Sequence, residues 1–380
     1  TPKTETMSAA VVALESITPA LKVVRLNRPS KLNALDMEMV RELRRVFRGL
    51  RSEALRTQKC ACVVVRGAGE KAFCAGGDVS AVRADGLEGG TLRHEFFGEE
   101  YAMNSLLGRL KESRVKQVSL WDGIVMGGGA GVSAHGRFRV ATEHAMFAMP
   151  ETQIGLFPDV GAAHFLRNMP RRSGTYVGLT GARLSAADLL YSGLATHFVP
   201  RAGLDDLLAR LQALPPSEED VEQFDAAVSK AIEDAAAAAA APSLPPSALE
   251  ANADEIERAF EKPTVEAIVS ELEAVGSQFA DDTLRTLSKM SPTSLKVTLE
   301  HLRRGRHHDL DATLRTDFRI VARMTDPDGT SDFFEGVRAL LVDKDRNPQW
   351  RRTLDQLSPA DVDAFFAPLP PPLADLDLNP

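Results

Sequence analysis

Two carboxylates, Glu151 and Asp159, lie eight residues apart in the segment Phe147–Gly161. The rest of this segment consists of apolar residues, glycines, prolines, one Thr and one Gln. A carboxylate in such surroundings loses solvation, and its pKa rises toward the range that is useful for proton transfer. A single acid would more simply be a solvated surface charge. Two acids in an apolar segment fixed by Gly and Pro predict an acid–base site.

Two glycine-rich turns could complete such a site. The first follows a short apolar run and contains Gly76-Gly77 before Asp78, and the second is Gly127-Gly128-Gly129. Glycine lets the backbone approach a ligand closely, and free N–H groups at the start of a helix attract negative charge. Two such N–H groups aimed at one carbonyl oxygen form an oxyanion hole. Together with the acid pair, the two turns predict acyl chemistry.

Other catalytic motifs fail on inspection. His94-Glu95 lacks the second His of a zinc protease helix, and Gly131–His135 lacks the second Gly of a nucleophile elbow. Val132 stands where a dinucleotide-binding turn needs Gly or Ala, and no Gly-Lys-Ser/Thr phosphate loop occurs. The basic stretch Arg303–His308 is more simply a solvated face or a partner patch than a metal site. We therefore expect no metal.

Composition sets the broad class. The chain has 380 residues, 44% hydrophobic and 26% charged, which is typical of a soluble globular protein. The net charge of -8 argues against nucleic-acid binding as a bulk property, and no apolar run approaches the roughly 18 residues of a membrane span. The three cysteines form no CxxC pair, which indicates a reducing compartment without structural disulfides or zinc. The initial Thr indicates a processed or trimmed chain without its targeting peptide.

Strands and helices alternate along the first half of the chain, which predicts an α/β fold. We expect strands at residues 11–15, 22–26, 60–65, 138–141 and 146–148, a helix capped by Asp36 and a second helix at 92–110. Composition shifts divide the chain into a catalytic core at 10–214, a Pro/Ala-rich linker or insertion at 215–250, a helical region at 251–355 and a Pro/Asp-rich tail at 356–380. From Pro368 onward the chain is expected to be disordered or draped over the surface.

Several segments resemble the crotonase (enoyl-CoA hydratase/isomerase) superfamily. They include Asn27-Arg28-Pro29, Leu32–Leu35, Phe73–Asp78, the triple glycine and Pro150-Glu151. More narrowly, His135–Glu143, Leu179–Leu184, Gly193–Val199, Ser291–Lys296 and Phe333–Ala339 resemble the 3-hydroxyisobutyryl-CoA hydrolase family. The resemblance covers roughly residues 10–350 apart from the alanine-rich insertion, and a match of this length and order is far more specific than any single motif.

The resemblance implies a crotonase-like spiral of ββα units, followed by helices, that binds an acyl-CoA. It assigns the two oxyanion-hole N–H groups to Gly77 and Gly128, the latter also contacting substrate, and the main catalytic carboxylate to Glu151. Asp159 and Glu100 match further positions that contact substrate. Coenzyme A would enter as part of the substrate, so no separate cofactor is expected.

The nucleotide end of CoA would lie near the loop that contains Lys31 and Asn33. By the same resemblance the protein would work in the mitochondrial matrix, with a homo-oligomer as one option.

Two positions distinguish hydrolysis from hydration. Hydratases of the superfamily carry a second catalytic Glu where this chain has Gly131, and they usually carry Gly where it has Asp159. We hypothesise that the chain hydrolyses thioesters, with Glu151 as nucleophile or as general base on water. Asp159 would orient the substrate hydroxyl or transfer a proton.

Two alternatives remain beside the hydrolase. Relatives of this family serve as components of the small subunit of mitochondrial ribosomes, so a structural role there is the first alternative, and a hydratase or isomerase is the second. The segment Arg114–Gly123 departs from the family pattern because it lacks a proline and places Trp121-Asp122 next to the glycine turn. This departure bears on substrate range and on activity.

Overall fold

The computed structural model describes residues 10–110, 113–214, 220–240, 242–327, 332–371 and 373–378. Its main sheet has the strand order β1-β2-β3-β5-β7-β9. These strands are Val12–Ser16, Leu21–Leu26, Ala61–Gly67, Val115–Trp121, Phe138–Ala141 and His197–Phe198. The first pair is antiparallel and all the other neighbours are parallel. The strands predicted at 11–15, 22–26, 60–65 and 138–141 are therefore present, with ends that differ by up to two residues.

A second, three-stranded parallel sheet has the order β4-β6-β8 and consists of Ala72–Cys74, Ile124–Met126 and Met146–Ala148. Each strand of this small sheet follows a strand of the main sheet, so the chain passes from β3 to β4, from β5 to β6 and from β7 to β8. A helical segment follows each pair. This repetition is the predicted spiral of ββα units, and it brings the ends of the three short strands to one place.

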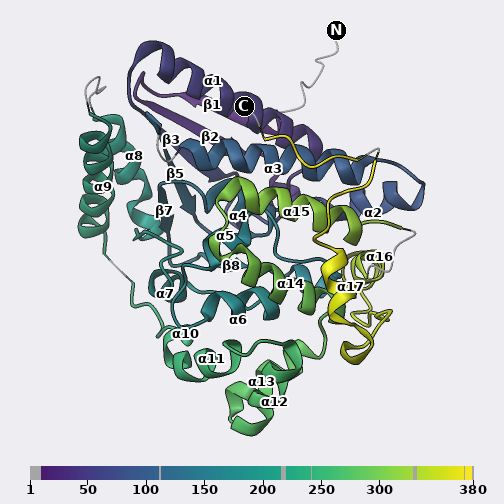
Figure 1. Cartoon of the computed structure of the whole chain (residues 1–380). Helices are drawn as coiled ribbons and strands as arrows, with labels where there is room; N and C mark the ends of the chain where they lie inside the picture. The colour runs from purple at the N-terminus through teal and green to yellow at the C-terminus, as the bar shows by residue number, and fades with distance from the viewer. Residues whose placement is uncertain are drawn as a thin grey trace, which may run out of the picture.

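Two long helices, α1 (Met37–Thr57) and α3 (Leu92–Leu110), pack against each other beside the main sheet (Figure 1). The side chain of Asp36 accepts a hydrogen bond from the N–H of Met39, as expected of an N-cap. Shorter helices come between or after the strands of the small sheet in the sequence: α2 (Val79–Leu87), α4 (Gly128–Ser133), α5 (Ala162–Leu166), α6 (Ser173–Thr180) and α7 (Ala186–Tyr191).

Helices α8 (Leu204–Gln212) and α9 (Val221–Ala238) form a layer of their own at the left of Figure 1. Leu207 of α8 and Val228 and Ile232 of α9 share a buried cluster with Cys62 and Val118 of the main sheet. The region expected to be a linker or insertion, 215–250, therefore contains a packed helix, while 215–219 lie outside the described residues.

The C-terminal helices return to the core. They are α10 (Ala248–Ala251), α11 (Ala253–Phe260), α12 (Val265–Val275), α13 (Gln278–Leu287), α14 (Pro292–Arg304), α15 (Leu310–Met324), α16 (Phe333–Val337), a π-helical turn at Arg338–Val342, and α17 (Pro359–Ala364). Helix α15 contacts α3, and α14 contacts α6, so both halves of the chain share one hydrophobic core.

The described part of the tail is draped over this core. Arg319 of α15 pairs with Asp375, and Arg109 of α3 donates to the carbonyl oxygen of Leu378 at 2.9 Å. Among the described residues, no helix combines the length and the apolar character needed to cross a membrane.

Candidate active site

The first glycine turn leaves β4 and runs beside Leu35. The N–H of Leu35 donates to the carbonyl of Gly76, and the N–H of Asp78 donates to the carbonyl of Leu35, both at 2.8 Å. Gly76 has a φ of 108°, which an L-residue with a side chain rarely adopts. These two bonds hold the turn on both sides of Gly77 but do not use the Gly77 N–H. Among the described residues that N–H has no acceptor, so it is available to a ligand.

The second glycine turn lies against the first. Gly127 has a φ of 46°, and α4 begins at Gly128, whose N–H stands in the first turn, where a helix has no acceptor of its own. A Cβ built on Gly128 would lie only 3.4 Å from the nitrogen of Gly77. The two N–H groups predicted to form the oxyanion hole therefore belong to adjacent turns.

Glu151 lies directly beside this pair of turns. It opens a short 3-10 helix, Glu151–Ile154, three residues after β8 ends, and it is buried. A Cβ on Gly127 would lie 2.8 Å from its Oε1 atom, so a side chain there would displace the carboxyl group. Its Oε2 atom is buried without a hydrogen-bond partner among the described residues. Burial raises the pKa of Glu151 well above its usual value, and the nearby Asp159 raises it further.

Asp159 is the second buried carboxyl group of the site. Its Oδ2 atom accepts a hydrogen bond from the Tyr101 hydroxyl at 2.7 Å. Burial raises the pKa of Asp159 to about 7, although the Tyr101 bond acts in the opposite direction. Hydrogen bonds hold the next two residues in place: the Gly161 N–H donates to Asp317 at 2.7 Å, and His135 bonds to the Val160 carbonyl at 2.8 Å.

Glu100 supplies a third carboxyl group, from α3. It is 2% exposed, and a Cβ on Gly128 would collide with its Oε1 atom. This atom has no hydrogen-bond partner among the described residues. Burial raises the pKa of Glu100 well above its usual value, with a further contribution from Asp159. Because neighbouring carboxylates repel each other, an ionised Asp159 favours the protonated forms of Glu100 and Glu151.

These three carboxyl groups and both glycine turns line one cavity of about 300 Å³. Its other walls are mostly apolar: Val79, Phe96, Phe97, Met126, Ile154, Leu156, Leu340 and Leu341. The last two come from the π-helical turn near the C-terminus, so the second half of the chain closes the cavity that the first half builds. The structure thus brings together Gly77, Gly128, Glu100, Glu151 and Asp159.

Lys31 and Asn33 do not line this cavity. Lys31 is an exposed residue at the end of the short helix Pro29–Lys31. Asn33 is fully buried: its amide nitrogen donates to the carbonyls of Ala68 and Ala72, and its amide oxygen accepts from the N–H of Arg28. Its side-chain bonds tie its own loop to the loop at Ala68 and to the start of β4, so the structure does not favour a direct contact of this side chain with substrate.

Gly131 faces a crowded part of the core. A Cβ on Gly131 would lie 2.8 Å from both Asn104 Nδ2 and Val160 Cβ. Atoms this close cannot coexist without a shift, so this backbone leaves no room for a side chain at the position of the second hydratase Glu. Asn104 itself is fully buried, and neither polar atom of its side chain has a partner among the described residues.

The segment that departs from the family pattern is structural. Trp121 ends β5, is fully buried and donates from Nε1 to Ser133 Oγ at 2.9 Å. Asp122 pairs with Arg201 at 2.9 Å. Neither residue lines the cavity with the three carboxyl groups, so the departure does not alter its walls directly.

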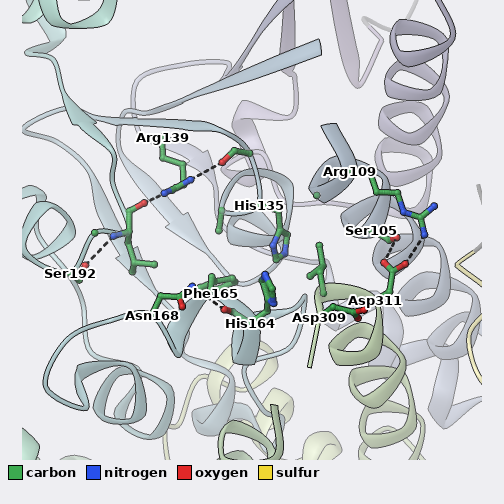
Figure 2. Close-up of a pocket in the computed structure, with 16 residues that line it drawn as sticks. Ser105, Arg109, His135, Arg139, His164, Phe165, Asn168, Ser192, Asp309 and Asp311 are labelled. Carbon is green, nitrogen blue, oxygen red and sulfur yellow. Dashed lines mark hydrogen bonds and ion pairs between the residues drawn. The ribbon is translucent and has the colours of Figure 1, made fainter. Parts of the chain in front are cut away.

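A larger cavity, of about 560 Å³, lies elsewhere (Figure 2). Arg109 pairs with Asp311 at one end, and Arg139 donates to the carbonyls of Leu194 and Gly136 at the other. None of the three carboxyl groups with a raised pKa lines this larger cavity. Nor do the described residues contain a group of three or more His, Cys, Asp or Glu side chains that could hold a metal ion.

Sequence reasoning missed three features of the site. Tyr101 follows Glu100 directly, but no sequence pattern pairs it with Asp159, 58 residues away. Leu340 and Leu341 come from a distant segment with no catalytic motif. Arg183, an exposed residue that also lines the cavity, lies in a segment noted only for its family resemblance.

The enoyl-CoA hydratase/isomerase family model matches residues 21–366. The chain belongs to this family. It is 42% identical over 353 residues to a probable 3-hydroxyisobutyryl-CoA hydrolase 3 of Arabidopsis thaliana, covering 91% of this chain and 89% of the relative. It is also 42% identical over 350 residues to the mitochondrial 3-hydroxyisobutyryl-CoA hydrolase of Xenopus tropicalis, covering 91% and 86%.

Solved structures of the same family have the same fold. The structure of a carnitinyl-CoA dehydratase from Mycobacterium thermoresistibile superposes with a TM-score of 0.82 at 33% identity, covering 97% of this chain and 99% of that one. An enoyl-CoA hydratase from Rhodobacter sphaeroides gives a TM-score of 0.80 at 33% identity, covering 94% and 98%. The predicted crotonase-like α/β fold is therefore confirmed.

Proposed function

We propose that the protein hydrolyses an acyl-CoA thioester, with 3-hydroxyisobutyryl-CoA as substrate and 3-hydroxyisobutyrate and CoA as products. The single observation that carries this proposal is the one cavity that Glu151, Asp159 and Glu100 line together with Gly77 and Gly128. The curated relatives at 42% identity carry the name of this hydrolase, whereas the solved structures named dehydratase and hydratase are 33% identical.

Gly131 supports hydrolysis over hydration. Adding water to a double bond in this family uses a second Glu at that position, and the neighbouring Asn104 and Val160 leave no space for it. This chain instead has a second carboxyl group at Asp159, which follows Glu151 in the sequence, whereas position 131 precedes it. Asp159 lines the same cavity as Glu151. The hydratase or isomerase alternative is therefore disfavoured.

In the proposed reaction the thioester carbonyl oxygen lies between the N–H groups of Gly77 and Gly128. These two donors stabilise the negative charge that develops when the carbonyl carbon is attacked, which contributes several kcal/mol in enzymes of this kind, on the order of 3 for one donor. Glu151 attacks as nucleophile or removes a proton from the attacking water. If Glu151 acts as base, the oxygen of water adds to the carbonyl carbon, the C–S bond breaks, and the proton taken up by Glu151 passes to the leaving sulfur. If Glu151 acts as nucleophile, the C–S bond breaks as a mixed anhydride forms; water then hydrolyses this anhydride to the free acid and the Glu151 carboxyl group, whose proton passes to the thiolate.

Asp159 and Glu100 bind the 3-hydroxyl of the acyl group. A carboxylate accepts a hydrogen bond from a hydroxyl group and a protonated carboxyl group donates one, so the pair can satisfy both the hydrogen and the lone pairs of that hydroxyl. An acyl chain without the hydroxyl would leave these buried groups without partners, which is costly. This accounts for a preference for 3-hydroxyacyl groups.

The direct test is release of free CoA thiol from 3-hydroxyisobutyryl-CoA by the purified protein, with isobutyryl-CoA as the matched substrate that lacks the hydroxyl. We expect release from the first and release at least about tenfold slower from the second. Folded protein that leaves the first substrate intact contradicts the proposal. Conversion of an unsaturated acyl-CoA to its hydrated form would instead support the hydratase alternative.

The relative from Xenopus tropicalis is named mitochondrial, and we propose the mitochondrial matrix as the location of this protein as well. A homo-oligomer and a role in the small subunit of the mitochondrial ribosome remain predictions from the sequence. No relative or structure described above carries a ribosomal name.

A further inference from the structure

A separate cavity of about 320 Å³ lies at the N-terminal end of α6. Four of its lining residues are arginines from three places in the sequence: Arg167 after α5, Arg171 and Arg172 before α6, and Arg306 after α14. Glu257 of α11 is the one acid among its lining residues. The basic stretch Arg303–His308, which no catalytic motif explains, thus contributes a residue to a hollow rather than only to a solvated face.

The positive charge in this cavity is only partly balanced. Arg171 pairs with Asp254 and, at 2.9 Å, with Glu257. Among the described residues, the Arg167 side chain donates only to main-chain carbonyls, including that of Gly305 at 3.2 Å.

Arg172 and Arg306 make no side-chain hydrogen bond or ion pair within the part of the chain that the structure describes. The cavity is therefore lined by two arginines without a charged partner among the described residues and by a third, Arg167, whose partners are uncharged. Like charges gathered in a hollow repel one another, and a bound anion relieves this repulsion. The clustering occurs in a chain whose net charge is -8, so a general excess of basic residues does not explain it.

The backbone that presents two of these arginines is strained. Arg171 and Arg172 have φ values of 54° and 59°, in the left-handed region that non-glycine residues seldom occupy. The N–H of Ser173 donates to the Pro170 carbonyl at 2.9 Å and holds the turn. Strain of this kind costs free energy and persists where a defined geometry is required. Here it directs two consecutive arginines around the start of α6.

We propose that this arginine-lined cavity binds a small phosphate-bearing anion with more than one negative charge, in the class of inorganic pyrophosphate. Guanidinium groups match phosphate oxygens through paired N–H donors, and several of them around one hollow favour a multivalent anion over a single carboxylate. The cavity shares no residue with the catalytic cavity. Helix α6 separates the two, since Gly181, just after its C-terminal end, lines the catalytic cavity.

The test is calorimetric titration of the full chain with pyrophosphate at low salt, repeated with saturating CoA. We expect one site per chain, an affinity that CoA leaves unchanged and a loss of at least about tenfold in Arg172→Gln and in Arg306→Gln. The matched control is Arg45→Gln, an exposed arginine of α1 that pairs with Glu42, and its affinity should equal that of the unmodified chain. Thermal unfolding of each variant confirms that it is folded.

Three results would overturn the proposal. The first is no saturable binding of pyrophosphate at millimolar concentration. The second is binding that both Arg172→Gln and Arg306→Gln retain in full, which would place the anion elsewhere. The third is displacement by CoA, which would show that the phosphates of the substrate occupy these arginines. If a variant fails to fold, the salt dependence of pyrophosphate binding to the unmodified chain is the deciding measurement. An affinity that does not decrease as NaCl rises from 50 to 500 mM also contradicts the site.

Discussion

The catalytic cavity and the larger cavity of Figure 2 differ in how their charged groups are paired. In the larger one, Arg109 and Asp311 neutralise each other at 2.6 Å and Ser105 donates a further bond to the same carboxylate. In the smaller one, Glu100 and Glu151 each keep a buried oxygen without a partner among the described residues. The functional site is therefore identified by unbalanced buried carboxyl groups and not by size.

The difference follows from the elements that build each cavity. Around the catalytic cavity, Gly127 and Gly128 leave the space that the carboxyl groups of Glu151 and Glu100 occupy, and a Cβ at either position would displace them. Burying these groups without cations costs free energy, which a structural site would avoid by pairing them. Residues that keep such a cost are the best candidates for chemistry.

The largest expected effect comes from Glu151→Gln. The substitution keeps the shape of the side chain but removes its capacity to act as nucleophile or base, so kcat for thioester hydrolysis should fall by about a thousandfold or more. The matched control is Asp311→Asn in the larger cavity, which should change kcat less than about twofold. Equal losses in the two variants, measured by thiol release, would remove the distinction between the cavities.

Asp159→Asn should lower kcat about a hundredfold and change the pH dependence of stability. The folded protein raises the pKa of Asp159 to about 7 from 3.8, so folding favours the protonated form. The resulting stability is fully present below pH 4 and is lost as the pH rises through 7. Asn cannot ionise, so the variant should gain stability relative to the unmodified chain at pH 8 and not at pH 4. Urea unfolding at both pH values measures this, and a gain that is the same at both contradicts the buried, raised carboxyl group.

Much of the fold could be predicted from local sequence. The strands at 138–141 and 146–148 and the helix at 92–110 have the predicted bounds, because apolar periodicity and glycine breaks are local signals. The helix at Val221–Ala238 was harder to place, since its contacts with the main sheet cross from one half of the chain to the other. A run of alanines shows helix propensity but not the surface on which the helix packs.

The site was predictable to the extent that it depends on the chain itself. The two glycine turns and the acid pair stand in recognisable motifs, and the structure brings them together with Glu100. Tyr101, Asn104 and the π-helical leucines depend on tertiary packing and carry no motif. Asn33 shows the opposite case, because a polar residue in a family motif proves to bind main-chain carbonyls.

Gly131→Ala should destabilise the fold by roughly 1–3 kcal/mol, because the added Cβ would overlap Asn104 and Val160. The matched control is Gly49→Ala in α1, where a Cβ meets nothing within 4 Å. This substitution should stabilise the helix by about 0.5–1 kcal/mol. Urea unfolding compares the two. Gly131→Glu should likewise not create hydratase activity. A stable Gly131→Glu protein that hydrates an unsaturated acyl-CoA would show that the crowding is not what separates the two reactions.

Tyr101→Phe should have the smallest effect and the most specific one. The Tyr101 hydroxyl donates to Asp159 and lowers the pKa of that carboxyl group, so its removal should raise the pKa further. The rising limb of the pH–rate profile should move to higher pH, with about a tenfold loss of kcat near pH 7 that shrinks as the pH approaches 9. Tyr176→Phe, at a mostly buried tyrosine outside the catalytic cavity, should leave the profile in place. A uniform loss of kcat at all pH values in Tyr101→Phe would mean that the hydroxyl supports packing alone and does not tune the carboxyl group.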